Sequence, residues 1–118
     1  MRNLTSHKVN GLNEALDIAV LDEPGQGNAC HKYQIANDGE VECYIEFQNG
    51  PIGDVGVNGI SNESLLAVVE DRLHGFQSGP YACRDNAVAL TKIQEAMMWL
   101  QKRTRDRLAR GVEGTHKV

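Results

Sequence analysis

The sequence predicts an α+β fold, in which a small antiparallel β-sheet in the N-terminal half is followed by a C-terminal helical hairpin. Three observations predict it. Residues 15–48 largely alternate apolar and polar side chains, as β-strands do, and turn residues interrupt them. Residues 62–76 and 85–110 repeat apolar side chains every three or four positions, as helices do. A chain of 118 residues is also long enough for one modest core, so we expect a single domain over residues 15–118.

The first fourteen residues carry no periodic pattern. Residues 1–14 are polar and include Asn10 and Gly11, so we expect a loosely packed N-terminal arm. Residues 15–22 alternate well enough to predict the first strand of the sheet. Residues 23–28 contain proline and two glycines and are typical of a loop.

A β-hairpin is predicted next in the chain. Residues 30–36 and 40–48 alternate on either side of Asn-Asp-Gly at 37–39, a triplet that tolerates positive φ. Glycine then recurs at every third position within residues 49–60, so we expect an extended or looped segment that is not helical. The β-rich part of the domain is thus expected over residues 15–58.

The first long helix is predicted over about residues 62–76. Ser61 is a suitable N-cap, because its side chain can accept a backbone N–H and the first turn that follows is acidic. An apolar stripe follows the helical period and consists of Leu65, Leu66, Val68, Val69 and Leu73.

The second long helix is predicted over about residues 85–110. Polar residues 77–80 end the first helix, Asp85 is expected to cap the second, and Gly111 suits the position just after its end. A helix of this length is a rod of roughly 38 Å. Its broad apolar face consists of Ala89, Leu90, Ile93, Ala96, Met97, Trp99 and Leu100. The two helices form the helical hairpin of residues 61–111.

Charge and composition exclude several classes of function. Residues 1–75 carry 4 Lys/Arg against 12 Asp/Glu, whereas residues 76–118 carry 8 against 4. Long nucleic acids need many cationic contacts, so this mostly acidic chain is not expected to bind them. No stretch approaches the ~20 apolar residues that cross a membrane, and no export signal is visible.

The cysteines and the small apolar content indicate a cytoplasmic oligomer. Cys30, Cys43 and Cys83 are odd in number and far apart, which is typical of a reducing compartment rather than a disulfide scaffold. Aromatic residues make up only 5% of the chain, and its mean hydropathy is −0.41. We therefore expect a homo-oligomer, because association would bury additional apolar surface.

We expect no metal, no cofactor and no catalysis. The glycine-rich stretch 50–59 lacks the Gly-Lys-Ser/Thr ending of a phosphate-binding loop. The cysteines and histidines lack the paired spacing of zinc ligands. No local pattern marks a nucleophile with an oriented histidine.

The C-terminal arginines are the strongest candidates for a binding site. Arg103, Arg107 and Arg110 share one stripe of the helix, with Asp106 the only carboxylate near them. Guanidinium groups match phosphate oxygens in bidentate fashion, although they also complement the negative end of a helix dipole, which composition alone favours. Phe76 and Asn86 would add an aromatic face and an amide for a nucleotide, although by position they suit a core and a helix end.

Residues from FQNGPI at 47–52 to the C-terminus resemble the bacteriophage Thoeris anti-defence protein one family. The resemblance rests on the linked motifs VNGI, GFQSGPYACRDNA, LQKRT and GVEGTH, and the hairpin is similar to that of the phage anti-CBASS protein two. It implies a non-enzymatic sponge in the cytoplasm of an infected bacterium. Such proteins sequester cyclic ADP-ribose isomers made by TIR-domain enzymes. Related members form dimers or hexamers and also capture cyclic di- or trinucleotides at separate sites.

The resemblance also implies which residues hold the ligand. Phe76 would stack on adenine, Asn86 would hydrogen-bond the base or ribose, and Arg103 would neutralise the pyrophosphate. Arg107 and Arg84 are further candidates, placed by proximity. The family also uses an arginine from the β-half, whereas this chain has none between Arg2 and Arg72, so His31 or Lys32 is a candidate replacement.

Two alternatives stay open from the sequence. One is an enzyme that cleaves cyclic nucleotides, which would need a general base near the arginines. The other is a protein-binding module whose basic C-terminal helix docks on an acidic partner.

Overall fold

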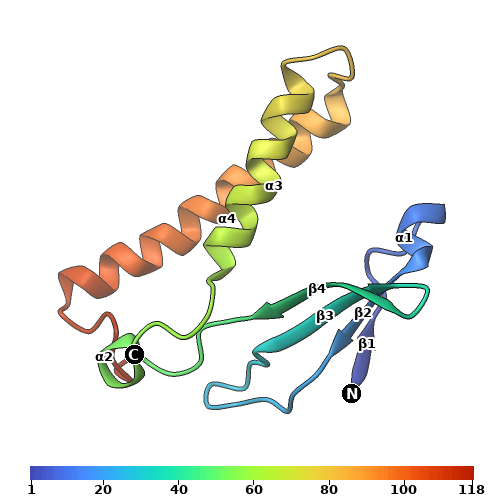
Figure 1. Ribbon diagram of the computed structural model, residues 1–118. Helices are drawn as coiled ribbons and strands as arrows, with labels where there is room; N and C mark the ends of the chain where they lie inside the picture. The colour runs from blue at the N-terminus through green and yellow to red at the C-terminus, as the bar shows by residue number, and fades with distance from the viewer. The chain divides into compact units, whose positions relative to one another are not determined.

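The computed structural model describes all residues, 1–118, and divides into two compact units. The first unit comprises residues 1–50 and 55–60, and the second comprises residues 51–54 and 61–118. The first holds the β-sheet and the second holds the long helices (Figure 1). The α+β class is therefore confirmed, whereas a single domain over residues 15–118 stays a prediction.

The first unit is a four-stranded sheet in the order β1-β2-β3-β4, with every neighbouring pair antiparallel. A short helix, α1, joins the first two strands. The elements are β1 (Arg2–Leu4), α1 (Gly11–Ala15), β2 (Leu16–Val20), β3 (Lys32–Asn37) and β4 (Glu40–Glu46). The β3–β4 hairpin turns at Asp38 and Gly39, both with positive φ, which confirms the turn predicted at 37–39.

The register of the sheet gathers apolar side chains on one face. Leu4, Ile18, Ile35 and Cys43 form one row of Cα partners across all four strands. Because side chains in one such row project to the same side, this row supplies an apolar face. Val20 is the most deeply buried large side chain of the unit, at 1% exposure.

The expectation of a loosely packed arm over residues 1–14 is wrong. The β1 strand pairs with β2 along its whole length, and Asn10 caps α1 through a bond from the Asn13 N–H. The His7 ring bonds the Leu16 carbonyl oxygen at 2.6 Å, and the Lys8 ammonium lies 3.1 Å from an Asp17 carboxylate oxygen. These long-range partners lie in β2, and a polar sequence gives no sign of them.

The glycine-rich segment contains one short helical turn, α2 (Ile52–Val55), so the expectation that residues 49–60 hold no helix is wrong. Around it, Phe47 and Ile60 form an isolated parallel bridge. The Gln48 amide donates to the Gly56 carbonyl at 2.7 Å and accepts the Asn58 N–H at 2.9 Å. The side chain of Gln48 therefore holds the loop closed.

The second unit is built on two antiparallel helices, α3 (Asn62–Gln77) and α4 (Arg84–Ala109), which lie side by side in Figure 1. Ser61 caps α3 as predicted, through a reciprocal capping box with Ser64. Cys83 caps α4 through its Sγ, so the prediction of Asp85 as the cap is wrong by two residues. Gly111 follows the helix with φ of +71°, which agrees with its predicted role.

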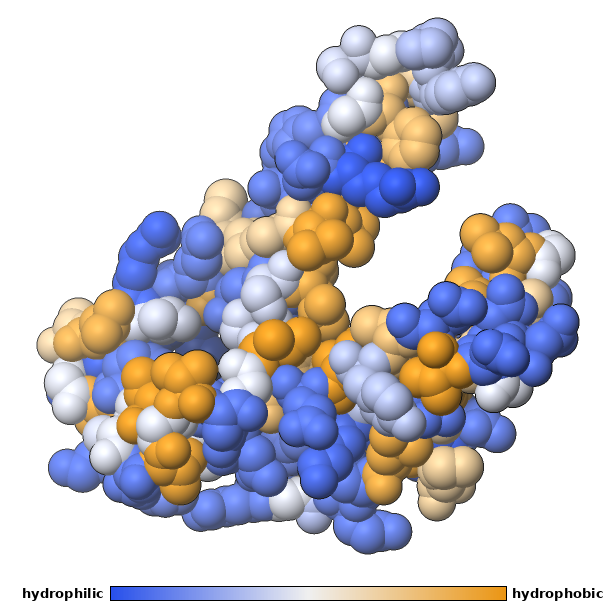
Figure 2. Space-filling model, viewed as in Figure 1, coloured by the Kyte–Doolittle hydropathy of each residue, from blue (hydrophilic) through white to orange (hydrophobic).

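Few apolar side chains of the second unit are buried within it. Leu90 and Val112 are buried, whereas Val69, Met98 and Trp99 are 44%, 61% and 67% exposed. Figure 2 shows apolar side chains at the surface of the hairpin, between hydrophilic ones. No helix has both the length and the apolar character needed to span a lipid bilayer.

Candidate functional site

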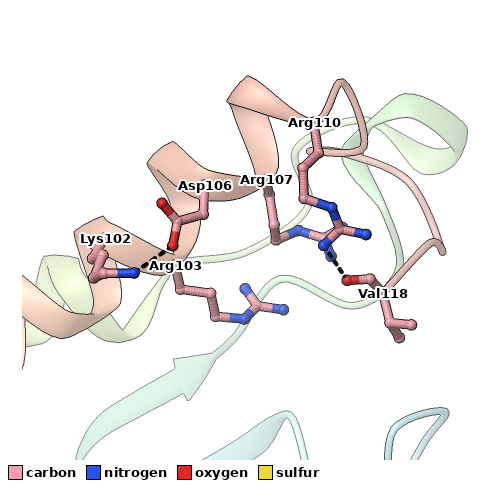
Figure 3. Close-up of a pocket in the computed structure, with 6 residues that line it drawn as sticks. All are labelled: Lys102, Arg103, Asp106, Arg107, Arg110 and Val118. Atoms are coloured by element: carbon pink, nitrogen blue, oxygen red, sulfur yellow. Dashed lines mark hydrogen bonds and ion pairs between the residues drawn. The ribbon is translucent and has the colours of Figure 1, made fainter.

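A basic hollow lies at the C-terminal end of α4 (Figure 3). Its volume is about 430 Å³. It is lined by Lys102, Arg103, Asp106, Arg107, Arg110 and Val118. Four of the six side chains are cationic and one is acidic. The α-helix brings them together because residues three and four apart share a face.

The cations of this basic hollow differ in how they are already paired. Lys102 lies 2.6 Å from an Asp106 carboxylate oxygen, and Arg110 donates to the Val118 carbonyl at 2.6 Å. Arg103 is exposed and forms no hydrogen bond or ion pair within the chain, and Figure 3 shows its guanidinium unbonded to its neighbours. Arg103 is therefore the guanidinium here that is free to bind an anion.

Arg107 has a different environment from the other arginines. It is 9% exposed and is the only buried charged residue. Its Nε donates to a Glu113 carboxylate oxygen at 3.0 Å, and its Nη atoms donate to the carbonyls of Val112, Thr115 and Lys117. The sequence indicated Asp106 as the only nearby carboxylate, and that expectation is wrong, because the chain turns back after Gly111 and brings Glu113 to Arg107.

Phe76 lies in the last turn of α3 and is half-buried. The guanidinium carbon of Arg72, one helical turn earlier, lies 5.1 Å from the centre of the Phe76 ring. This is a cation–π contact, worth about 0.5–1 kcal/mol at an exposed site. Arg72 was not among the predicted site residues. Its position four residues before Phe76 on a helix could have indicated this contact.

Asn86 and Arg84 lie in the first turn of α4, beside the connection from α3. The Asn86 backbone N–H donates to Cys83 Sγ at 3.4 Å, and its side-chain amide has no partner within the chain. The Gln77 amide oxygen accepts the Cys83 N–H at 3.1 Å, which ties the end of α3 to the start of α4. Arg84 is exposed and has no ionic partner.

A single chain does not bring all the predicted site residues together. Phe76 and Asn86 both lie at the connected end of the hairpin. Arg103 is 17 residues after Asn86 on the same continuous helix, which places the two Cα atoms about 26 Å apart along the axis. The basic hollow and the Phe76–Asn86 end are therefore two separate parts of one long helix pair.

His31 and Lys32 lie at one end of the sheet. They line a smaller hollow of about 220 Å³ with Glu46, Phe47, Asn49 and Asn58. The Asp22 carboxylate accepts the backbone N–H groups of both residues, at 2.9 and 3.1 Å. Burial raises the pKa of Asp22, but these N–H groups and the charge of His31 lower it more, so its pKa lies below the ordinary 3.8.

The titratable side chains form no metal centre. The structure has no group of three or more His, Cys, Asp or Glu side chains that could hold a metal ion. Its three cysteines are free, with Cys30 buried and the other two exposed.

The model of the Acb2/Tad1 hairpin-domain family matches residues 39–105 of this chain. That range is more than half of the sequence and holds Phe76, Arg84, Asn86 and Arg103, whereas Arg107 lies beyond it. The chain belongs to the Acb2/Tad1 hairpin family. The family assignment made from the linked motifs is thus confirmed.

A named relative agrees with the family assignment. The chain is 45% identical over 93 residues to "Thoeris anti-defense 1" of Bacillus phage SBSphiJ7. The match covers 79% of this chain and 66% of the relative, so the chain spans about two thirds of the length of that protein.

Proposed function

We propose that this protein is a phage anti-defence sponge that binds cyclic ADP-ribose isomers made by TIR-domain enzymes and holds them uncleaved. The family assignment and the name of the phage relative support an anti-Thoeris role. In this role the protein acts in the cytoplasm of the infected bacterium and keeps the signal from its effector. A sponge acts stoichiometrically, so tight binding serves it and turnover does not.

The proposed ligand contacts are those of three residues with free binding groups. Phe76 stacks on adenine, either through the ring face opposite Arg72 or with adenine displacing the Arg72 guanidinium. The Asn86 amide, which has no partner within the chain, hydrogen-bonds the base or ribose. Arg103 binds the pyrophosphate in bidentate fashion. Capture at nanomolar concentration corresponds to about −12 kcal/mol, toward which each charge-assisted hydrogen bond contributes roughly 1.5–3 kcal/mol.

The separation of Asn86 and Arg103 carries this proposal. A compact cyclic ADP-ribose isomer cannot span about 26 Å along one helix, so no single chain can supply both contacts. Two copies packed antiparallel place the connected end of one hairpin beside the basic hollow of the other. A two-fold axis then makes two identical sites, each shared between subunits.

The exposed apolar side chains of the hairpin support the same assembly. Met98 and Trp99 lie midway along α4, between Asn86 and the basic hollow, and both are mostly exposed. Burying such residues against a second copy removes apolar surface from water at roughly 25 cal/mol per Å². We propose a homodimer as the smallest binding unit, which can build further into a hexamer.

Cyclic oligonucleotides of the CBASS response are proposed as second ligands at separate sites. Arg84 lies in the same first turn of α4 as Asn86 and is exposed, so it stays a further candidate contact for the cyclic ADP-ribose ligand.

The first experiment is a calorimetric titration with cyclic ADP-ribose isomers, followed by heating of the complex and chromatography of the released ligand. The proposal expects tight binding and recovery of the intact ligand. A linear product would establish the enzyme alternative instead, and no binding would favour docking on an acidic protein partner.

A complementation experiment tests whether the site is shared between subunits. Phe76→Ala and Arg103→Ala are each expected to abolish tight binding alone. When the two variants are co-expressed, each mixed dimer has one site with both residues intact, so roughly a quarter of the wild-type sites should return. Co-expression that restores no site would refute the shared site, since a site within one chain cannot be rescued in this way.

A further inference from the structure

The chain beyond α4 folds back onto the helix and is bonded there by the buried side chain of Arg107. After Gly111, residues 112–118 turn toward the helix, and Arg107 donates to three of their carbonyls as well as to Glu113. Glu113 is 30% exposed at its side chain and Arg107 only 11%. We call residues 112–118 the C-terminal segment. A buried guanidinium with this many partners holds its surroundings in one geometry.

The C-terminal segment is also tied to residues 51–54 of the same unit. The Gly53 N–H donates to the Gly114 carbonyl at 2.9 Å, and a His116 ring nitrogen lies 3.0 Å from an Asp54 carboxylate oxygen. A Cβ at Gly53 would lie 2.7 Å from that carbonyl oxygen, so the backbones approach too closely for a side chain. Figure 1 shows the C-terminus beside α2.

The same segment forms one wall of the basic hollow. Val118 lines the hollow with Arg103, and its carbonyl holds the Arg110 guanidinium (Figure 3). If the segment detaches, this wall is lost and Arg110 loses its partner. Arg107, which also lines the hollow, holds this segment through its hydrogen bonds, so the shape of the anion site depends on them.

We propose that Arg107 is a positioning residue that holds the C-terminal segment against α4 and thereby shapes the anion site around Arg103. This rests on the proposed function only for the identity of the ligand. Four of the five N–H groups of Arg107 already donate to the protein, so in this proposal Arg107 acts on the segment and is not a bidentate contact of the ligand. The placement of Arg107 among the ligand contacts stays a prediction, and this proposal gives Arg107 a positioning role in its place.

Glu113→Gln separates positioning by Arg107 from direct binding. The substitution removes one negative charge near the hollow and weakens the hold on Arg107. If Arg107 contacted the anion, this would free the guanidinium and leave affinity unchanged or higher. If Arg107 positions the segment, affinity falls despite the more favourable charge. The matched control is Glu95→Gln, which removes the same charge from α4 at an exposed pair with Lys92.

The experiment measures binding of two probes, a cyclic ADP-ribose isomer and millimolar inorganic pyrophosphate, by the wild type, Glu113→Gln, Arg107→Met and Glu95→Gln. Hydrogen exchange of the Gly53 amide is followed in the same proteins, because that N–H is protected only while the segment is docked. We expect Glu113→Gln and Arg107→Met to bind both probes about tenfold more weakly than the wild type does and to exchange the Gly53 amide faster. Glu95→Gln should match the wild type in both measurements.

The outcomes distinguish this inference from the proposed function. Binding of pyrophosphate but not of cyclic ADP-ribose would refute the proposed ligand. The affinities of the variants for pyrophosphate would then still test the positioning role of Arg107. Unchanged or tighter binding by Glu113→Gln, unchanged Gly53 exchange, or failure of the wild type to bind either probe would overturn the inference. If Arg107→Met does not fold, the milder Glu113→Gln decides the question alone.

Discussion

Replacing Arg103 by alanine should remove ligand capture and leave the fold unchanged. The side chain is exposed and makes no hydrogen bond or ion pair within the chain, so its loss should change the free energy of unfolding by less than about 0.5 kcal/mol. In the proposed complex it makes two charge-assisted hydrogen bonds with the pyrophosphate. Losing these bonds should cost about 3 kcal/mol of binding free energy, which raises the dissociation constant roughly 150-fold.

The matched control is Arg105→Ala. Arg105 lies on the same helix, is exposed, has no ionic partner and does not line the basic hollow. The two variants therefore change net charge equally and differ only in where the charge was. Arg105→Ala should bind within about twofold of the wild type, since residues two apart on a helix do not share a face and an exposed charge is screened by salt.

The assay is calorimetric titration with cyclic ADP-ribose isomers at one fixed salt concentration, together with denaturant unfolding of each variant. Equal losses in Arg103→Ala and Arg105→Ala would refute the reasoning, because they would show that overall charge rather than a contact at Arg103 sets affinity. Loss of cooperative unfolding in Arg103→Ala would also contradict the structure.

Two further predictions concern the first unit. Asp22→Asn should destabilise the protein at pH 7. Because the pKa of Asp22 is lowered in the folded state, its stabilisation is present above the unfolded value of 3.8 and is lost as pH falls through the folded-state pKa, so the wild type and the variant should converge in denaturant unfolding as the pH falls further below 3.8. Gly59→Ala should destabilise by about 2 kcal/mol or more, because a Cβ there would lie 2.5 Å from the Phe47 carbonyl carbon. Gly11→Ala, with nothing within 4 Å, should be nearly neutral in the same denaturant unfolding, and equal losses of stability in both variants would contradict the close approach at Gly59.

Local patterns predicted most of the secondary structure. The hairpin turn at 37–39, the Ser61 cap and the Gly111 terminus are all decided by residues within three or four positions of one another, where side chains and backbone meet directly. The cap of α4 was missed because Cys83 is an uncommon N-cap, and Asp85 suits the role better by type.

The candidate site was only partly predictable. The sequence placed Arg103, Arg107 and Arg110 on one basic stripe and named Arg107 as a further ligand candidate, and the structure shows that Arg103 and Arg107 both line the basic hollow. Arg107 is buried and bonded to Glu113 because residues 112–118 turn back toward α4. No periodic pattern in the sequence predicts that turn. The pairing of Lys102 with Asp106 could be predicted from helical spacing. That Arg103 is the unpaired arginine follows only when the partners of Arg107 and Arg110 are known as well.

The sequence by itself determined the α+β class, the two long helices and the family, because periodicity, caps and linked motifs act over short stretches of chain. Tertiary structure alone decided the inclusion of β1 in the sheet, the burial of Arg107 and the docking of the C-terminal segment on residues 51–54. These features depend on hydrogen bonds between residues that no helix or strand period brings together. The free energy of such contacts depends on burial and mutual geometry, which exist only once the chain has folded.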